Sequence, residues 1–81
     1  MDNIYCRGYA KTRIDYDAGK IMETVYAVLP TGLILESDEA IKSNEFGRGR
    51  TWSPSFLDFD AVRAEAEFIG NYPAPDLNTR D

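Results

Sequence analysis

The chain has 81 residues, of which 43% are hydrophobic and 28% are charged, and its formal net charge is -5. A chain below the usual ~100 to 200 residues per domain cannot divide its apolar surface between two cores, which disfavours a large enclosed active site. The negative charge argues against a protein that holds nucleic acid mainly by neutralising phosphates. We expect residues 1–72 to form a single α+β domain and residues 73–81 to form an extended tail.

The first half of the chain predicts a β-meander. Along residues 4–14, mostly small or apolar side chains at even positions alternate with tyrosine, arginine and lysine at odd positions, which is the period of a half-buried strand. We expect the even side to face the core. Asp17-Ala18-Gly19 suits a three-residue hairpin loop, which places Tyr16 opposite Lys20.

Two further strands and a second turn follow. Residues 21–29 are rich in β-branched and aromatic side chains, and residues 33–36 form a third strand. Between them, Pro30-Thr31-Gly32 supplies the fixed φ of proline and the left-handed position of glycine.

The segment after the third strand predicts mixed structure. Residues 38–45 are compatible with a short helix after Ser37. Residues 46–55 contain Gly47-Arg48-Gly49-Arg50 and predict a loop, with a fourth edge strand around Thr51 and Trp52.

Residues 59–69 predict the main helix of the protein. Asp58 suits the N-cap position and Gly70 suits the C-terminal stop. Apolar side chains recur at helical spacing at Phe59, Val62, Ala66 and Ile69.

The predicted strands and the helix together indicate an α+β fold, in which one main helix packs on one face of an antiparallel sheet of three to four strands.

The residue types that most catalytic chemistry needs are missing from the sequence. Without histidine, the chain lacks the usual general base and the histidine-dependent nucleophile arrangements. One cysteine without histidine cannot fill the common zinc ligand sets. Cys6 lies on the expected inner side of the first strand, where a buried structural thiol is favoured over a reactive one. We therefore expect no enzyme activity, no cofactor and no bound metal.

Cysteine usage and hydropathy also bear on location. A single Cys6 can form no internal disulfide, which fits a reducing cytoplasm. No apolar run reaches the roughly 18 residues of a membrane span, and the N-terminus lacks the apolar core of a signal peptide. The sequence predicts a cytoplasmic protein that binds no membrane.

Two groups of neighbouring carboxylates could bind a hard cation. Asp15 and Asp17 resemble the start of a calcium loop, but the positions that follow break that motif, so hairpin-turn roles explain them better. Glu36, Asp38 and Glu39 could bind magnesium, although a solvated charged face explains them more simply. They keep a carboxylate and metal enzyme subunit open as one alternative function.

Aromatic and basic residues alternate along the odd side of the first strand. On a sheet face such a stripe can stack bases and neutralise phosphates, as single-strand binders do. The negative total charge favours a structural role instead, and a small accessory protein that binds single-stranded nucleic acid stays open as the other alternative. The residues in question are Tyr5, Arg7, Tyr9, Lys11 and Arg13, with the segment from Arg48 to Trp52 as a second such feature.

Acidic residues are the basis of the preferred hypothesis, which is that a negatively charged surface binds a partner. Asp58 and Glu65, like Asp60 and Glu67, are seven apart, so on a helix each pair repeats along one face at ~10.5 Å. If these carboxylates gather on one side with acids of the preceding segment, they can occupy a groove built for nucleic-acid phosphates. A normal solvated helix face is the alternative explanation. The candidate partner-binding residues are Asp38, Glu39, Glu45, Asp58, Asp60, Glu65 and Glu67.

In size, charge and architecture, the whole chain resembles the small phage-encoded inhibitors of bacterial defence, anti-CRISPR proteins in particular. The resemblance implies a protein of the host-cell cytoplasm that binds a surveillance complex or a nuclease, in some members as a DNA mimic. We therefore predict an inhibitor whose partner is a basic surface of a nucleic-acid-handling protein or ribonucleoprotein complex, without direct contact to nucleic acid. Homodimer formation through an unpaired edge strand stays open.

Overall fold

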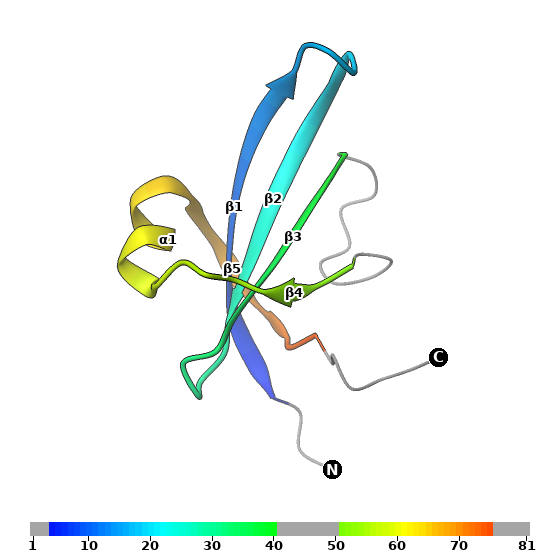
Figure 1. Ribbon diagram of the computed structural model, residues 1–81. Coiled ribbons are helices and arrows are strands. Elements are labelled where there is room, and N and C mark those ends of the chain that lie inside the picture. The colour runs from blue at the N-terminus through cyan, green and yellow to red at the C-terminus, as the bar shows by residue number, and fades with distance from the viewer. Residues whose placement is uncertain (1–3, 41–50, 76–81) are drawn as a thin grey trace.

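The computed structural model describes residues 4–40 and 51–75. These residues form a five-stranded antiparallel sheet and one short helix, which is an α+β fold (Figure 1). The strand order is β4-β3-β2-β1-β5, so β1 lies inside the sheet. The elements are β1 Tyr5–Asp15, β2 Lys20–Val28, β3 Ile34–Ala40, β4 Ser53–Pro54, α1 Phe59–Glu65 and β5 Glu67–Pro73.

The α+β class and the antiparallel sheet are confirmed, but the predicted count of three to four strands is wrong. The unexpected strand is β5, which the sequence pattern assigned to the end of the helix. It pairs with the free edge of β1, with Cys6 opposite Tyr72 and Gly8 opposite Gly70. The glycine predicted as a helix stop, Gly70, instead lies beside a register shift in this pairing and has a φ of 124°.

The first hairpin has a different register from the predicted one. Asp15 pairs with Lys20, so the turn takes four residues rather than three, and the predicted pairing of Tyr16 with Lys20 is wrong. Asp15 fixes the longer turn, because its carbonyl accepts from Gly19 N at 2.8 Å and its Oδ1 accepts from Ala18 N at 3.1 Å. Gly19 has a φ of 68°, the left-handed conformation expected of it.

Apolar side chains pack on both faces of the sheet. On one face Tyr9, Tyr26 and Val28 pack with Ile34 and with Val62 of α1. We call this face, which α1 covers, the helix face. The even side of β1 was predicted to face the core, and Cys6 on that side is 3% exposed, but the odd side also packs in a core, because Tyr9 is only 8% exposed.

The opposite face has its own buried cluster. Cys6, Ala27 and Leu35 pack there, with the half-buried rings of Trp52 and Tyr72 against them. The sheet is therefore a central layer with apolar contacts above and below it.

The helix begins where it was predicted but ends earlier. Asp58 is the N-cap, and its Oδ1 accepts from Ala61 N at 2.9 Å. The last helical residue is Glu65, because at Ala66 the backbone becomes extended, with φ -133° and ψ 156°. The predicted helix over residues 59–69 is thus a helix of seven residues followed by β5.

The remaining boundaries differ from the predicted ones by a few residues. Residues 38–40 extend β3 rather than starting a helix, and residues 41–45 lie outside the described residues. The fourth strand, predicted near Thr51 and Trp52, is β4, in which Pro54 pairs with Leu35 of β3.

The chain after β5 stays attached to the sheet for a short distance. Ala74 N donates to Ile4 O at 2.8 Å, next to the pairing of Tyr5 with Pro73. Of the predicted extended tail over residues 73–81, Pro73 is the last residue of β5, and residues 76–81 lie outside the described part of the chain.

Candidate functional site

Glu65, at the end of α1, makes two hydrogen bonds to the sheet. Lys11 Nζ donates to Glu65 Oε1 at 2.9 Å, and Tyr26 Oη donates to Glu65 Oε2 at 3.4 Å. The hydrogen bond from Lys11 lowers the pKa of the Glu65 carboxyl and raises the pKa of the Lys11 ammonium group. Burial raises the pKa of the Tyr26 phenol. A carboxylate predicted to meet a partner thus ties α1 to β1 and β2.

The two predicted acids of β3 lie on opposite faces of the sheet. Asp38 lies on the helix face, where it accepts from Arg13 Nη2 and from Thr24 Oγ1, both at 2.9 Å. Glu39 lies on the other face, because side chains alternate along a strand. Its Oε2 accepts from Thr51 N at 2.7 Å. The strand therefore does not bring these two carboxylates together.

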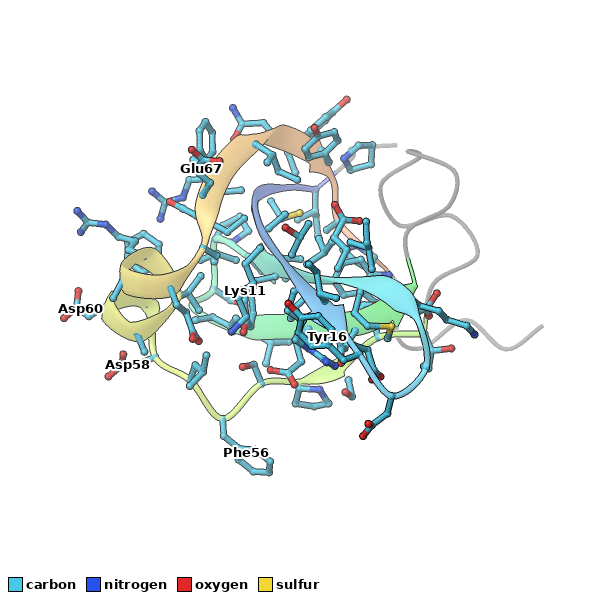
Figure 2. All side chains as sticks on the ribbon, turned by 90° about the horizontal axis from the view of Figure 1, so that it is seen from above. Lys11, Tyr16, Phe56, Asp58, Asp60 and Glu67 are labelled. Atoms are coloured by element: carbon cyan, nitrogen blue, oxygen red, sulfur yellow. The ribbon has the colours of Figure 1, made fainter. Side chains whose placement is uncertain are left out.

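Asp58, Asp60 and Glu67 are exposed around α1. Figure 2 shows Asp58 and Asp60 beside the helix and Glu67 well apart from them. The prediction that Asp60 and Glu67 repeat along one helix face is wrong, because the helix ends before Glu67, which pairs with Ala10 in the sheet. Neither Asp60 nor Glu67 forms a salt bridge with another residue that the structure describes. Glu45 lies outside those residues, and a shared partner surface of all seven acids stays a prediction.

The aromatic and basic stripe of β1 is mostly occupied by contacts within the protein. Tyr9 is buried, with its ring edge-on to Phe59 at a centroid distance of 5.9 Å. The lysine and arginine that follow it are the ion-paired residues described above. Only Tyr5 and Arg7 remain exposed without such a pair, so the stripe is not an open platform for bases. Residues 48–50 of the second basic segment lie outside the described residues.

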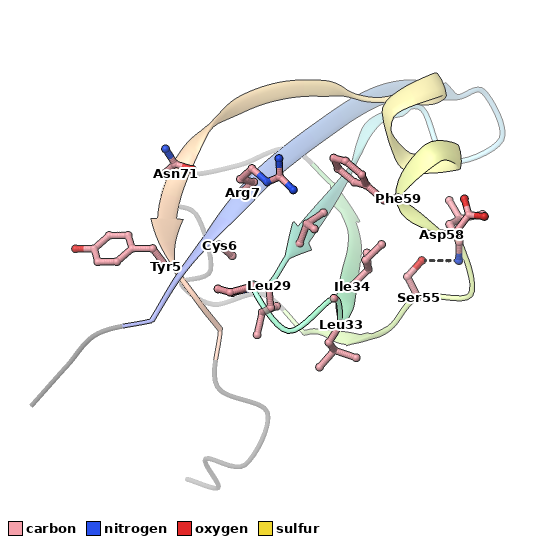
Figure 3. A pocket seen from close by; sticks show the side chains of 14 residues that line it. Tyr5, Cys6, Arg7, Leu29, Leu33, Ile34, Ser55, Asp58, Phe59 and Asn71 are labelled. Atoms are coloured by element: carbon pink, nitrogen blue, oxygen red, sulfur yellow. Dashed lines mark hydrogen bonds between the residues drawn. The ribbon is translucent and has the colours of Figure 1, made fainter.

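A groove of about 610 Å³ opens at the end of the sheet where β2 turns into β3 (Figure 3). Most of its lining side chains are apolar, and they come from β1, from the turn between β2 and β3 with the strand ends beside it, from the loop before α1 and from the first residue of α1. Asn71 of β5 completes the lining. At its rim, Tyr5 is 53% and Leu33 is 46% exposed. The lining residues include Arg7, Leu29, Leu33, Leu57, Phe59 and Asn71.

The loop between β4 and α1 forms one wall of this groove. Ser55 N donates to Ile34 O at 2.8 Å, and Leu57 N donates to Ser55 Oγ at 3.1 Å, which holds the loop against the end of β3. Between them, Phe56 is fully exposed and points away from the molecule (Figure 2). Phe56 is therefore an exposed apolar side chain next to the groove in sequence, but it does not line the groove.

Two guanidinium groups share one aromatic ring at the groove. Arg7 Cζ lies 4.7 Å and Arg63 Cζ lies 5.6 Å from the centroid of the Phe59 ring. Among the described residues, neither arginine forms a salt bridge with a carboxylate. The groove therefore combines apolar walls with one positively charged side chain, Arg7, and one negatively charged side chain, Asp58, while Arg63 lies nearby on the Phe59 ring.

Sequence patterns did not predict this groove. The signals that point to it are apolar residues within expected turns and loops: Leu33 directly after a turn, and Phe56 with Leu57 just before the N-cap Asp58. Scattered surface apolar residues are common in proteins, so the groove becomes visible only when the fold brings them together.

The other candidate chemistry has little support in the geometry. Cys6 is 3% exposed, and burial raises the pKa of its thiol, so the prediction of a buried structural cysteine is confirmed. In residues 4–40 and 51–75, no three histidine, cysteine, aspartate or glutamate side chains are grouped so as to hold a metal ion.

The chain was compared with protein-family models, curated proteins and solved structures. No family model, curated protein or solved structure matches the chain. Within the described segments, no helix is long and apolar enough to cross a membrane.

Proposed function

We propose that this chain is a protein-binding domain that holds an exposed apolar segment of another protein in the groove between Leu33 and Phe59. The observation that carries the proposal is the apolar groove of about 610 Å³ with exposed apolar side chains at its edge. Binding sites of this kind combine apolar walls with a few polar groups that orient the ligand. Here Arg7, Ser55 and Asn71 supply the polar groups.

The exposed apolar side chains supply the driving force for this binding. Removing apolar surface from water contributes about 25 cal/mol per Å². Leu33 and Tyr5, which line the groove, have such surface to lose, since they are 46% and 53% exposed. A groove of this size admits a few side chains of a partner rather than a folded domain, so the expected occupant is a short extended segment.

A random peptide library selected on the immobilised protein tests this function. We expect selected peptides to share apolar residues and to lose about tenfold in affinity for Leu33→Asp, because replacing an apolar contact of the groove by a charged side chain costs more than about 1 kcal/mol. Ile21→Asp is the matched control, as Ile21 is 53% exposed but lies on the distant hairpin. A library that yields no binders, or equal effects of the two changes, argues against the groove.

We infer a second candidate function, inhibition of a nucleic-acid-handling protein by carboxylates that stand in for DNA phosphates. The observation in its favour is that Asp60 and Glu67 are exposed and form no salt bridge with the other described residues. Long-range attraction to a cationic partner steers such an encounter and weakens with salt.

Charge reversal tests the second candidate. Basic proteins captured from a bacterial lysate at low salt are expected to be lost when Asp60 and Glu67 are both changed to lysine. The control changes Asp15 and Asp17 to lysine, which gives the same change of net charge at the hairpin turn. Equal losses with both double variants indicate a general charge effect and contradict a specific acidic surface.

A further inference from the structure

We propose that the segment held in the groove carries an acidic residue next to its apolar side chain, and that Arg7 binds this carboxylate. The inference rests on the proposed function, and it specifies the partner chemistry of the same site. The observation behind it is the arrangement of two guanidinium groups around the Phe59 ring at the groove.

Arg7 differs from the other arginine of β1 in its contacts. Arg13 forms a salt bridge, its Nη2 lying 2.9 Å from Asp38 Oδ2. Arg7 has no such carboxylate among the described residues and stacks over Phe59 at 4.7 Å. Stacking on a ring fixes the plane of a guanidinium group and leaves its N–H donors available at the edges.

Arg63 strengthens the positive potential at the same place. Two cations close to one ring repel each other, and a carboxylate placed near both relieves that repulsion. In a protein with a net charge of -5, these two guanidinium groups give an acidic ligand a place to bind at the Phe59 ring.

The groove sets where the acidic residue of the ligand lies. Asp58 also lines the groove and repels a carboxylate, but one of its oxygens is held by Ala61 N at the start of α1. Figure 3 shows Arg7 and Asp58 well apart in the groove, with Phe59 above Asp58. The acid of the ligand therefore sits at the Arg7 end, near Asn71, and the apolar side chain sits between Leu33 and Leu57.

Arginine and carboxylate form paired, charge-assisted hydrogen bonds, which makes the contact selective for acids. A peptide that contains only apolar residues contacts the walls of the groove, but the N–H donors of Arg7 then remain hydrogen-bonded to water. The acidic residue therefore decides which apolar segments bind best.

The test is peptide selection on three forms of the protein: wild type, Arg7→Glu and the control Lys20→Glu. Lys20 gives the same change of charge at the far end of the hairpin. On wild type and Lys20→Glu we expect peptides with aspartate or glutamate beside apolar residues. Those peptides should bind Arg7→Glu about tenfold more weakly, and selection on Arg7→Glu should return lysine or arginine at that position with the same apolar residues.

The possible results of this selection distinguish a failure of the groove function from a failure of the role of Arg7. If no peptide is selected on wild type, the proposed function fails. If apolar peptides are selected without an acid, or bind Arg7→Glu as well as wild type, the groove stands and the role of Arg7 is overturned. Tight binding of a single-stranded oligonucleotide that Arg7→Glu abolishes also overturns it, because the ligand would then be a phosphate. Arg7→Gln, with its folding checked by circular dichroism, is expected to lose the acid preference without reversing it.

Discussion

Two side-chain hydrogen bonds join α1 to the strands β1 and β2. The residues that form them are Lys11, Tyr26 and Glu65. The Glu65 carboxylate accepts from the other two side chains, so α1 is fixed to β1 and β2 at its C-terminal end. At its N-terminal end, Asp58 caps the helix and lines the groove. A helix of seven residues has little stability of its own, so contacts at both ends decide its position. The groove wall formed by Phe59 depends on them.

The Glu65 contact predicts a dependence of stability on pH. Because the Lys11 hydrogen bond lowers the pKa of Glu65 in the folded state, the contribution of this contact to stability is complete above the ordinary carboxyl pKa of 4.5 and is lost as pH falls through the lowered value. Lys11 has a raised pKa, so its share is lost only as pH rises through that value, above 10.5. The contact is therefore intact at neutral pH.

We expect Glu65→Gln to flatten the acid limb of the stability curve. Thermal midpoints measured by circular dichroism between about pH 5 and pH 3 should fall less steeply for the variant than for wild type. Glu67→Gln removes an exposed carboxylate that makes no salt bridge with the described residues, and it should keep the wild-type slope. Parallel curves for wild type and Glu65→Gln contradict the assigned link.

At the scale of elements, features fixed by neighbouring residues were predictable and features fixed by distant ones were not. The Asp58 cap and the left-handed Gly19 and Gly32 depend on bonds within a few residues, and all three are present. Residues 66–69 have helical spacing and good local propensity, yet most of them form β5. The exposed edge of β1 offers those residues strand hydrogen bonds, and such tertiary pairing overrides a propensity of under about 1 kcal/mol per residue.

The candidate site could not be predicted from the sequence, because it too is formed by residues that are distant in the chain. Its apolar wall comes from a turn and a loop that lie more than twenty residues apart in the sequence, and its cation comes from β1. Alternation in β1 correctly predicted a strand, but it could not tell which face α1 would cover. The acids Asp38 and Glu65 were predicted to bind a partner, and although both are exposed, each forms a salt bridge with a basic residue on that face.

The sheet edges bear on self-association. The outer strand β4 has two residues and includes Pro54, which lacks an N–H donor. The other outer strand, β5, is broken by the irregularity at Gly70. Short strands, proline and bulges are features by which proteins hinder edge-to-edge pairing. Both outer strands therefore carry features that hinder a homodimer formed by edge-to-edge pairing.

For the molecule as a whole, the two apolar clusters share the same strands. Tyr9 and Cys6 lie on opposite faces of β1, and Ile34 and Leu35 are adjacent in β3. A change in packing on one face shifts the strand that the other face packs against. We expect the domain to unfold as one cooperative unit, as small single domains usually do.

Val62 and Trp52 allow a direct test of this cooperativity. Val62 is fully buried on the helix face, so Val62→Ala should cost about 2 kcal/mol from lost burial and the cavity that remains. Trp52 is the single tryptophan and packs on the opposite face, so its fluorescence reports the other cluster. Val62→Ala should lower the unfolding midpoint by about 10 °C in both tryptophan fluorescence and circular dichroism. The exposed control Ile14→Val should change the free energy of unfolding by no more than about 0.5 kcal/mol, which moves either midpoint by only about 2 to 4 °C. A fluorescence midpoint that stays at the wild-type value while the circular dichroism midpoint falls means that the two faces unfold independently.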